Sequence, residues 1–350
     1  MSLVPAREAD SDGDADTVLV AGGTGFTGRA IVRDLVSGPP SADVTRTRTT
    51  ARAEATARTE VGAQARVRVL ARRRPSAGVL PPSVAYTAAD LTDRASVEAS
   101  CEGVTTLVHT VTYVGRDPAR CDAVNRVGTR TLLDAARRAG VRRILYISTA
   151  SVYGDGPHRG AAEGELTPRP RSVASASRLE AEHMVRDAGG VVLRPHLVFG
   201  EGDRWVVPTL ARLLARVPRW GSAWSHSSMI AVEDLARLVG ALVRQDAVDG
   251  GEVYHAAHPR PVSMRSLVFA LCPLLGLPRP EPGLSVKEHR ELCAHSMPEL
   301  SAHQHELLTS DHWYDSSRVW RRAGVEPGPD VLDRLADYAD WYTRHLRGAA

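Results

Sequence analysis

A glycine-rich turn between a predicted strand and a predicted helix constrains this chain more than any other feature. Residues 17–20 (TVLV) are β-branched and apolar, which is typical of a strand buried on both faces of a parallel sheet. Three glycines follow at three-residue spacing, and apolar residues then recur at helical spacing up to residue 36. Strand, glycine turn and helix in this order predict the first half of a dinucleotide-binding βαβ unit.

The chemistry of a bound pyrophosphate accounts for the glycines. Gly22 permits a tight turn, Gly25 lets the backbone approach the pyrophosphate, and Gly28 lets the helix pack against the strand. The helix N-terminus then offers free N–H groups and a positive dipole end to the phosphates. A tight turn without a ligand is the alternative interpretation. The residues predicted to bind cofactor here are Gly22, Thr24, Gly25, Phe26, Thr27 and Gly28.

Alternating strands and helices continue after this unit. Further strands are predicted at 67–71, 84–86, 107–110, 143–148 and 191–195, and a long helix at 117–139. This alternation predicts an α/β fold with a doubly wound parallel (Rossmann) sheet over residues 17–198 and ligand at the carboxyl ends of the strands.

Beyond residue 198 the strands shorten and prolines become frequent. Helices are predicted at 207–216, 232–243, 263–275, 285–295 and 330–346. We expect a small, mostly helical C-terminal substrate cap over 199–350, with residues 227–258, through Met229-Ile230 and Val253-Tyr254, returning to the Rossmann sheet. Residues 1–16 are predicted to be a disordered acidic tail, and residues 37–66 a flexible insertion without an apolar pattern.

The composition limits the kinds of partner that the chain is expected to bind. A formal charge of +3 on 350 residues does not indicate nucleic-acid binding, and no apolar run is long enough to span a membrane. The four cysteines form no CxxC pair, which fits a reducing cytoplasm. We therefore expect a cytoplasmic monomer or homodimer that binds a small-molecule substrate, and neither nucleic acid nor membrane.

The second predicted strand ends in three arginines, at residues 72–74. An acidic residue at this position accepts hydrogen bonds from a ribose 2′-hydroxyl, whereas arginine suits a 2′-phosphate. Arg72 therefore predicts NADP(H), with NAD(H) the less favoured cofactor. A solvated arginine cluster is the alternative.

Several ordered motifs together resemble one family. They are AGGTGFTG at 21–28, Asp90-Leu91, the segment 109–111, Asn125, ISTASVYG at 147–154 and RPHLVFG at 194–200. The chain resembles the extended short-chain dehydrogenase/reductases, also called the NAD-dependent epimerase/dehydratase superfamily. The resemblance implies further cofactor contacts at Asp90, Leu91, Thr110, Val111, Arg178 and Pro195.

The resemblance breaks in the expected active site. Family members use a Ser or Thr, a Tyr acting as general acid/base, and a Lys that binds the nicotinamide ribose. Thr149 matches the hydroxyl residue. When the segment 172–182 is aligned with the family's Tyr–Lys motif, Ala174 falls at the position of the Tyr and Arg178 at that of the Lys. Tyr113 and His196, which follow the strands ending near residues 110 and 195, are the possible replacement proton donors. His109 lies at the end of the strand predicted at 107–110, and the resemblance implies a structural role for it.

A metal site is not expected. His289, His295, His303 and His305 fit no zinc-ligand spacing, so they are predicted to be exposed on helices or loops.

Three functions remain open. The first is an NADPH-dependent ketoreductase acting on a bulky polyketide or steroid-like ketone, since family members in polyketide antibiotic pathways reduce ketones without the Tyr–Lys pair. The second is a nucleotide-sugar epimerase, dehydratase or reductase, for which the missing Tyr is hard to replace. The third is a non-catalytic NAD(P)-binding sensor or scaffold. Losing a general acid costs about 10²–10⁴ in rate, whereas orientation supplies effective molarities of about 10⁵–10⁸ M. A one-way reduction therefore stays feasible, and we favour the first.

Overall fold

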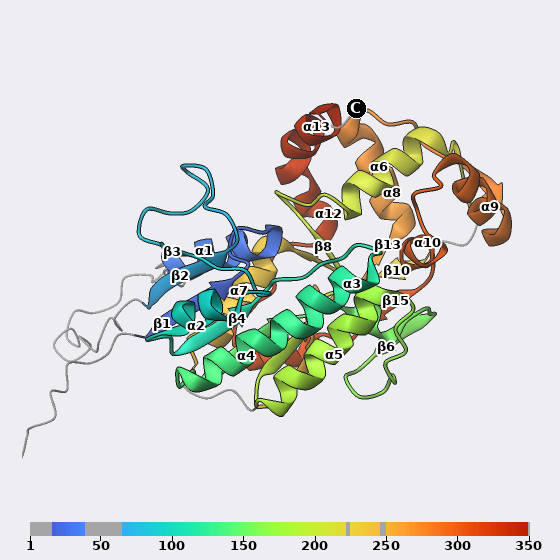
Figure 1. Cartoon of the computed structure of the whole chain (residues 1–350). Coiled ribbons are helices and arrows are strands. Elements are labelled where there is room, and N and C mark those ends of the chain that lie inside the picture. The colour runs from blue at the N-terminus through green and yellow to red at the C-terminus, as the bar shows by residue number, and fades with distance from the viewer. Residues whose placement is uncertain (1–15, 39–64, 222–224, 246–249, 349–350) are drawn as a thin grey trace, which may run out of the picture.

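A seven-stranded parallel sheet forms the centre of the N-terminal part of the molecule (Figure 1). The computed structural model describes residues 16–38, 65–221, 225–245 and 250–348, so almost all of the predicted tail (1–16) and insertion (37–66) lies outside the described residues. The strand order is β12-β7-β5-β4-β1-β2-β3. The strands are β1 (Thr17–Ala21), β2 (Arg66–Ala71), β3 (Ala85–Ala88), β4 (Thr106–His109), β5 (Arg143–Ile147), β7 (Val191–Arg194) and β12 (Val253–His255).

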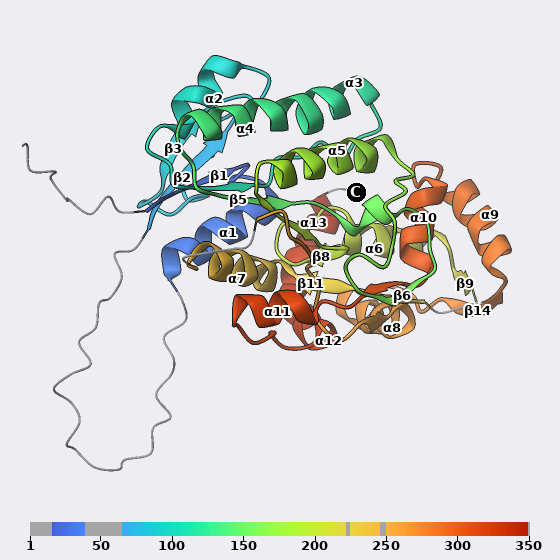
Figure 2. The same cartoon turned by 90° about the horizontal axis from the view of Figure 1, so that it is seen from below.

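Helices cover both faces of this sheet, which confirms the predicted doubly wound α/β fold (Figure 2). One face carries α1 (Phe26–Ser37), α7 (Val232–Val243) and α11 (Ser317–Ala323), and the other carries α2 (Arg94–Cys101), α4 (Gly128–Arg138) and α5 (Val173–Asp187). Side chains of β1 alternate between the two layers. Val18 and Val20 pack in the cluster formed with α1 and α7, whereas Leu19 packs in the cluster formed with α2 and α4. The order of the strands reverses between β1 and β4, which is where such sheets bind their ligands.

The helix predicted at 117–139 is interrupted by a wide turn. It consists of α3 (Pro118–Cys121), the π-helical η1 (Asp122–Val127) and α4. A π-turn adds a residue to the helix and is frequent at functional sites. Here it places the side chain of Asn125 in the interior, at 1% exposure.

The C-terminal part forms a mostly helical cap beside the sheet, as predicted (Figure 1). Its helices are α6 (Val206–Arg216), α8 (Met264–Leu275), α9 (Val286–Ser296), α10 (Ala302–Thr309), α12 (Val331–Arg334), η3 (Leu335–Tyr338) and α13 (Ala339–Gly348). The cap has its own core, in which Leu210, Trp220 and Leu267 are buried. The predicted helix 330–346 is therefore three successive helical pieces.

Three small sheets lie outside the main sheet: two connect the cap to its strand ends, and the third, β14 (Glu281–Leu284) with β9 (Arg219–Gly221), lies within the cap. The largest has the order β13 (Val262–Ser263), β10 (His226–Ser227), β15 (His312–Tyr314) and β6 (His158–Ala161). The others pair β11 (Met229–Ala231) with β8 (Leu197–Phe199), and β14 with β9.

The prediction that Met229-Ile230 joins the main sheet was wrong. These residues pair with β8, because β8 turns away from the main sheet immediately after β7. Val253–His255 does extend the main sheet, as its edge strand β12 beside β7. No helix in the described ranges is long and apolar enough to cross a membrane.

Candidate functional site

The glycine turn after β1 is closely packed against the loop that follows β4. Gly22 has φ +85°, and a Cβ there would lie 2.6 Å from Thr110 Oγ1 and 3.0 Å from Val111 N. A Cβ on Gly28 would lie 2.2 Å from the Gly22 carbonyl oxygen. Gly25 precedes α1 and provides no side-chain cap. The first-turn N–H groups, including those of Phe26 and Thr27, are thus available to an anion.

A cavity of about 250 Å³ opens beside this turn. It joins segments that are far apart in sequence: the turn after β1, the end of β2, the segment after β3 and the loop after β4. The cavity is lined by Gly22, Thr24, Gly25, Leu70, Ala71, Arg72, Ala89, Asp90, Leu91, Thr110, Val111, Thr112, Tyr113, Arg120 and Val124. The structure therefore gathers most of the residues predicted to bind cofactor. Arg178 and Pro195 lie elsewhere, on α5 and after β7.

Asp90 and Arg72 both line this cavity. The Asp90 carboxylate accepts hydrogen bonds from the Thr92 backbone N–H (3.0 Å) and hydroxyl (2.8 Å). These bonds, the backbone N–H foremost, lower the pKa of Asp90, and the positive charge of Arg72 adds to the effect. Leu91 fills the space next to α4, because a Cβ on Gly128 would lie 2.8 Å from Leu91 Cβ.

Asn125 fixes the loop after β4. Its Oδ1 accepts from the Tyr113 backbone N–H (2.7 Å), and its Nδ2 donates to the Tyr113 carbonyl (2.9 Å) and to Ser177 Oγ on α5 (2.9 Å). The Tyr113 ring lies under the Arg120 guanidinium, 4.5 Å from its centroid. A Cβ on Gly115 would lie 2.2 Å from the Tyr113 hydroxyl oxygen, so the ring folds back over its own loop.

Thr149 follows β5, and Arg178 of α5 contacts the last residue of that strand. Thr149 caps the short helix η2 (Ala150–Tyr153): its Oγ1 accepts from the Ser151 N–H (3.1 Å) and donates to Ser151 Oγ (3.2 Å). Arg178 donates from Nη2 to the carbonyl of Ile147 (3.2 Å). Its Nε and the nearby Nδ1 of His109 are buried with no partner in the described chain.

The start of α5 presents Ala174 where a tyrosine would stand. Ser172 caps the helix and forms a reciprocal capping box with Ser175. Ala174, in the first turn, is half-buried and carries no group that can transfer a proton. Further along α5, Glu182 accepts a bidentate ion pair from Arg194, which also donates to the Tyr153 hydroxyl (2.8 Å). This buried pair fixes α5, β7 and η2 relative to one another.

His196, just after β7, is half-buried, and both of its ring nitrogens are buried with no partner among the described residues. Its ring stacks on that of His312, with centroids 5.3 Å apart. Burial, reinforced by the neighbouring His312, lowers the pKa of His196 well below its usual value. The imidazole is therefore neutral at neutral pH.

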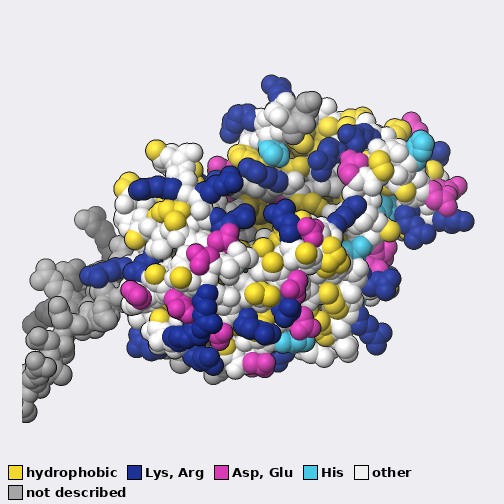
Figure 3. Space-filling model, viewed as in Figure 1, with side chains coloured by type: hydrophobic (Ala, Val, Ile, Leu, Met, Phe, Trp, Pro, Cys, Tyr) yellow, Lys and Arg dark blue, Asp and Glu magenta, His cyan; other side chains and the backbone are white. Residues whose placement is uncertain are grey.

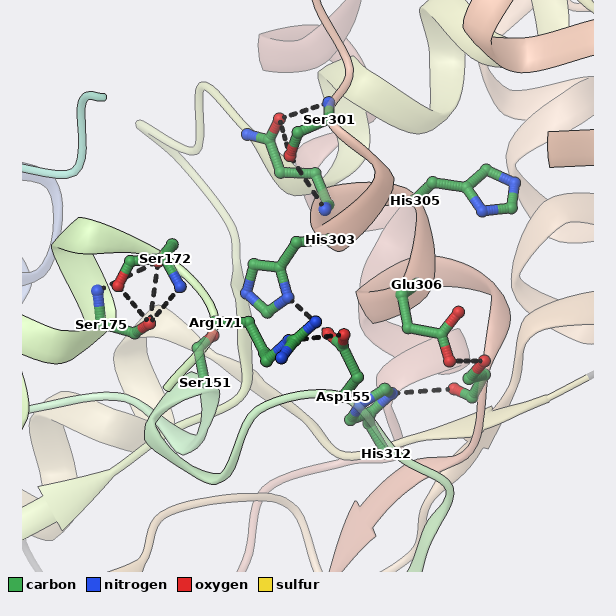
Figure 4. A network of polar contacts seen from close by, with 12 residues as sticks. Ser151, Asp155, Arg171, Ser172, Ser175, Ser301, His303, His305, Glu306 and His312 are labelled. Atoms are coloured by element: carbon green, nitrogen blue, oxygen red, sulfur yellow. Dashed lines mark hydrogen bonds and ion pairs between the residues drawn. The ribbon is translucent and has the colours of Figure 1, made fainter. Parts of the chain in front are cut away.

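His303 of the cap pairs with Asp155, which follows η2, close to the start of α5. His303 Nδ1 on α10 lies 2.7 Å from Asp155 Oδ1, and Asp155 Oδ2 lies 3.2 Å from Arg171 Nε. Figure 4 shows this set beside Ser151 of η2 and across from Ser172 and Ser175. In the sequence, His303 stands out only as one of four cap histidines without zinc-ligand spacing. Its partner is 148 residues away, and no local signal connects the two.

The expected exposure of the cap histidines was partly wrong. His295 is exposed, but His289 and His305 are each only 2% exposed. They are buried because α9 and α10 pack together with one face toward the cap core.

Comparison with known proteins agrees with this architecture. The model of the NAD dependent epimerase/dehydratase family matches residues 18–257. A 2-alkyl-3-oxoalkanoate reductase from Stenotrophomonas maltophilia is 28% identical over 91% of this chain and 97% of its own length. A 3beta-hydroxysteroid-dehydrogenase/decarboxylase from Arabidopsis thaliana is 26% identical over 96% of this chain, which spans only 62% of that relative.

Solved structures extend the likeness in fold. A dTDP-glucose 4,6-dehydratase from Streptomyces venezuelae, with NAD and TYD bound, aligns with a TM-score of 0.68 and 21% identity. The alignment covers 95% of this chain and 98% of that one. The family match over more than half of the chain confirms the resemblance seen in the sequence motifs. Together with the closely packed glycine turn at Gly22 and the doubly wound sheet, this match shows that the chain is an NAD(P)-dependent oxidoreductase and belongs to the NAD dependent epimerase/dehydratase family.

Proposed function

We propose that this protein is an NADPH-dependent reductase of a bulky, largely apolar ketone, and that it works without the Tyr–Lys pair of its family. The observation that carries the proposal is the start of α5, where Ala174 stands at the position of the family's tyrosine. Thr149 still supplies a hydroxyl and Arg178 a positive charge at the positions that match the other two active-site residues. A one-way reduction tolerates this loss better than a reaction that must move a proton in both directions.

The residues present fit a nicotinamide dinucleotide. The close packing of the Gly22–Gly28 turn, which leaves no space for a Cβ on Gly22 or Gly28, sets the start of α1 beside the cavity, and Arg178 Nε is a buried donor without a partner among the described residues. When bound, the reduced dinucleotide would supply the hydride. Arg72, exposed beside the Asp90 carboxylate, would pair with a 2′-phosphate and so favour NADPH over NADH.

Thr149 is the residue suited to orient the ketone. Its hydroxyl proton is directed at Ser151 Oγ, a neutral acceptor, so rotation to a substrate carbonyl exchanges one hydrogen bond for another. A hydroxyl donor at this position would stabilise the negative charge that develops on the carbonyl oxygen. Arg178, held on the Ile147 carbonyl, would place positive charge near the same point.

His303 is the best-supported proton donor among the described side chains. Asp155 holds its Nδ1, as expected of a carboxylate that orients a catalytic imidazole. Tyr113 and His196, the donors expected from the sequence, are weaker choices. The Tyr113 hydroxyl is folded back on Gly115, and the buried His196 imidazole is neutral. Water and a substrate hydroxyl remain the other sources.

The surface between cap and sheet suits a large apolar substrate. Figure 3 shows hydrophobic side chains inside the hollow between the two parts, with basic side chains around its rim. The S. maltophilia relative is named as a reductase of a 3-oxoalkanoate, a compound of this kind.

Steady-state kinetics test the proposal. Purified protein is incubated with NADPH or NADH and a panel of β-ketoacids, steroid ketones and polyketide-like aromatic ketones, and loss of the reduced cofactor is followed by absorbance. We expect turnover of at least one bulky ketone, with NADPH preferred. Turnover of dTDP- or UDP-sugars instead would favour the nucleotide-sugar function. Tight NADPH binding without turnover of either class would favour a sensor or scaffold.

A further inference from the structure

Two helices of the cap bring three metal-binding side chains together, and we propose that they form a site for a zinc-type transition-metal ion. His289 and Cys293 lie one turn apart on α9, and His305 projects from α10. One ligand atom from each residue can be chosen so that all lie within 4.8 Å of one another. The inference does not depend on the function proposed above.

The separations are close to those of a tetrahedral site. Zinc–nitrogen bonds of about 2.0–2.1 Å and zinc–sulfur bonds of about 2.3 Å place two nitrogens about 3.3 Å apart, and a nitrogen and a sulfur about 3.6 Å apart. His289 Nδ1 lies 3.1 Å from His305 Nε2 and 4.0 Å from Cys293 Sγ, which is closer to the other ring nitrogen of His289, Nε2, at 3.5 Å. Small rotations of the Cys293 and His289 side chains would bring one atom from each of the three residues to bonding distance of one ion.

Thr309 orients His305 for such a role. The Thr309 hydroxyl donates to the His305 carbonyl (2.8 Å), so its oxygen is free to accept from His305 Nδ1–H, 3.3 Å away. This arrangement leaves the lone pair of His305 Nε2 facing His289 and Cys293. Metal-bound histidines are commonly held through their second nitrogen in this way.

The donor set selects the class of metal. Two imidazoles and a thiolate suit Zn²⁺ or Co²⁺ and not Mg²⁺ or Ca²⁺, which require oxygen ligands. The three side chains are each 2% exposed, and Trp220 covers His289 with ring centroids 4.9 Å apart. No fourth His, Cys, Asp or Glu of the described ranges joins the group, so water would complete the coordination. Binding would displace the thiol proton of Cys293 to solvent.

The ion would fasten α9 to α10. Because α10 also carries His303, which pairs with Asp155 in the segment after η2, a bound metal would steady the helix that positions this histidine. We therefore assign the ion a structural role in the cap.

Cobalt provides the direct test. Protein without an affinity tag is stripped with a chelator and titrated with Co²⁺, while a thiolate-to-metal charge-transfer band is followed by absorbance. Metal content is measured after loading with Zn²⁺. We expect one ion per chain, an intense charge-transfer band, and a higher melting temperature for the zinc-loaded protein.

Cys293→Ser should lose the band and the zinc-dependent rise in melting temperature. Cys272→Ser is the matched control, because Cys272 is another 2% exposed cysteine of the cap and lies outside the cluster. It should keep both signals. His305→Gln provides a second disrupting variant if Cys293→Ser does not fold. No band in the natural protein, or equal metal uptake by Cys293→Ser, would overturn the proposal and leave the three residues as a hydrogen-bonded group.

Discussion

At the scale of single residues, the groups proposed to bind cofactor lie apart from those proposed to act in the reduction. Gly22, Asp90 and Arg72 line the cavity beside the glycine turn. Thr149 and the contact of Arg178 with the Ile147 carbonyl lie at the carboxyl end of β5, and position 174 holds an alanine, which cannot transfer a proton. Changes at the two ends should therefore have separable effects on cofactor affinity and on rate.

Replacing Thr149 by Val removes the hydroxyl while keeping the shape. We expect kcat/KM for a ketone to fall about 10²–10³-fold, the usual cost of losing one donor to a developing oxyanion. The unfolding free energy should fall by only about 1 kcal/mol, the cost of a lost helix cap. Thr149→Ser should restore both, and Ser151→Ala should leave the rate nearly unchanged. A full-rate Thr149→Val protein would contradict the role.

Replacing Arg72 by Ala should remove the preference for NADPH. The loss of a charge-assisted contact with a 2′-phosphate costs about 1.5–3 kcal/mol, or roughly 10–100-fold in affinity. Affinity for NADH, which lacks this phosphate, should be unchanged. Arg74→Ala is the control, because that guanidinium lies over the Tyr86 ring, 6.0 Å from its centroid. Fluorescence titration of both cofactors measures the result, and an Arg72→Ala protein that keeps its preference would refute the assignment.

Replacing His303 by Gln tests the proton donor. We expect the rate of reduction to fall about 10²–10⁴-fold, as for loss of a general acid. Cofactor affinity should not change, because His303 lies on α10 of the cap and does not line the dinucleotide cavity. Asp155→Asn should give a smaller loss, and the exposed His295→Gln serves as control. An unchanged rate would assign the proton to water or to a substrate hydroxyl.

At the scale of elements, the sequence predicted what depends on local pattern. The strand–glycine–helix unit 17–37, the alternating strands and the main cap helices are found close to their expected bounds. The π-turn around Asn125 was missed, because one extra residue in a helix barely disturbs its apolar period. Short pairings such as β15 with β6 were also missed, since their partners are about 150 residues apart and each strand has only three or four residues.

The candidate site also consists of a part that local sequence patterns predict and a part that depends on long-range packing. The gathering of Gly22, Arg72, Asp90 and Thr110 around one cavity could be predicted, because these residues belong to a contiguous motif and to strand ends, whose position in a parallel sheet is fixed by topology. The His303–Asp155 pair and the His289–Cys293–His305 cluster depend on how α9 and α10 pack, which no local pattern encodes. Burial also reversed an expectation, since His289 and His305 were predicted to be exposed.

The π-turn should matter for both folding and binding. Asn125→Leu would leave the Tyr113 backbone N–H and carbonyl and the Ser177 hydroxyl without their shared partner. Buried polar groups left unpaired cost about 1–3 kcal/mol each. We expect urea unfolding to show a loss in this range or above, and NADPH to bind more weakly because the loop after β4 lines the cavity. Thr131→Val on α4, which loses only a bond to the Val127 carbonyl, is the control. Wild-type affinity and stability would contradict this role of Asn125.

At the scale of the whole molecule, many buried histidines share a lowered pKa. Burial is the main cause in every case, and it lowers the pKa to about 4 for His158 and His255 and to about 3 for His109. The histidines of the described chain with this shift are His109, His158, His196, His255, His289, His305 and His312. Among the described residues, three carboxyls have raised pKa values, again mainly through burial: Asp34, Glu163 and Asp203.

These lowered pKa values predict that the protein loses stability in mild acid. A histidine with a lowered pKa in the folded state stabilises the fold fully above pH 6.5, where the unfolded chain is also neutral. That contribution falls as the pH drops from 6.5 toward 4, because only the unfolded chain takes up the proton. A tenfold difference in proton affinity between the folded and unfolded chains corresponds to about 1.4 kcal/mol at full effect. The raised carboxyls act in the opposite direction over a similar range but are fewer.

Urea unfolding of metal-free protein at pH 7.5, 6.5, 5.5 and 4.5 measures this dependence. We expect the unfolding free energy to be nearly constant down to about pH 6.5 and then to fall by several kcal/mol. His158→Gln, which replaces one histidine hydrogen-bonded to the Tyr314 hydroxyl, should reduce the slope between pH 6.5 and 4.5 by up to one proton. His295→Gln is the control and should leave the slope unchanged, since this side chain is exposed and belongs to none of the buried histidine contacts. An unfolding free energy that stays constant between pH 7.5 and 4.5 would show that these histidines take up protons in the folded protein.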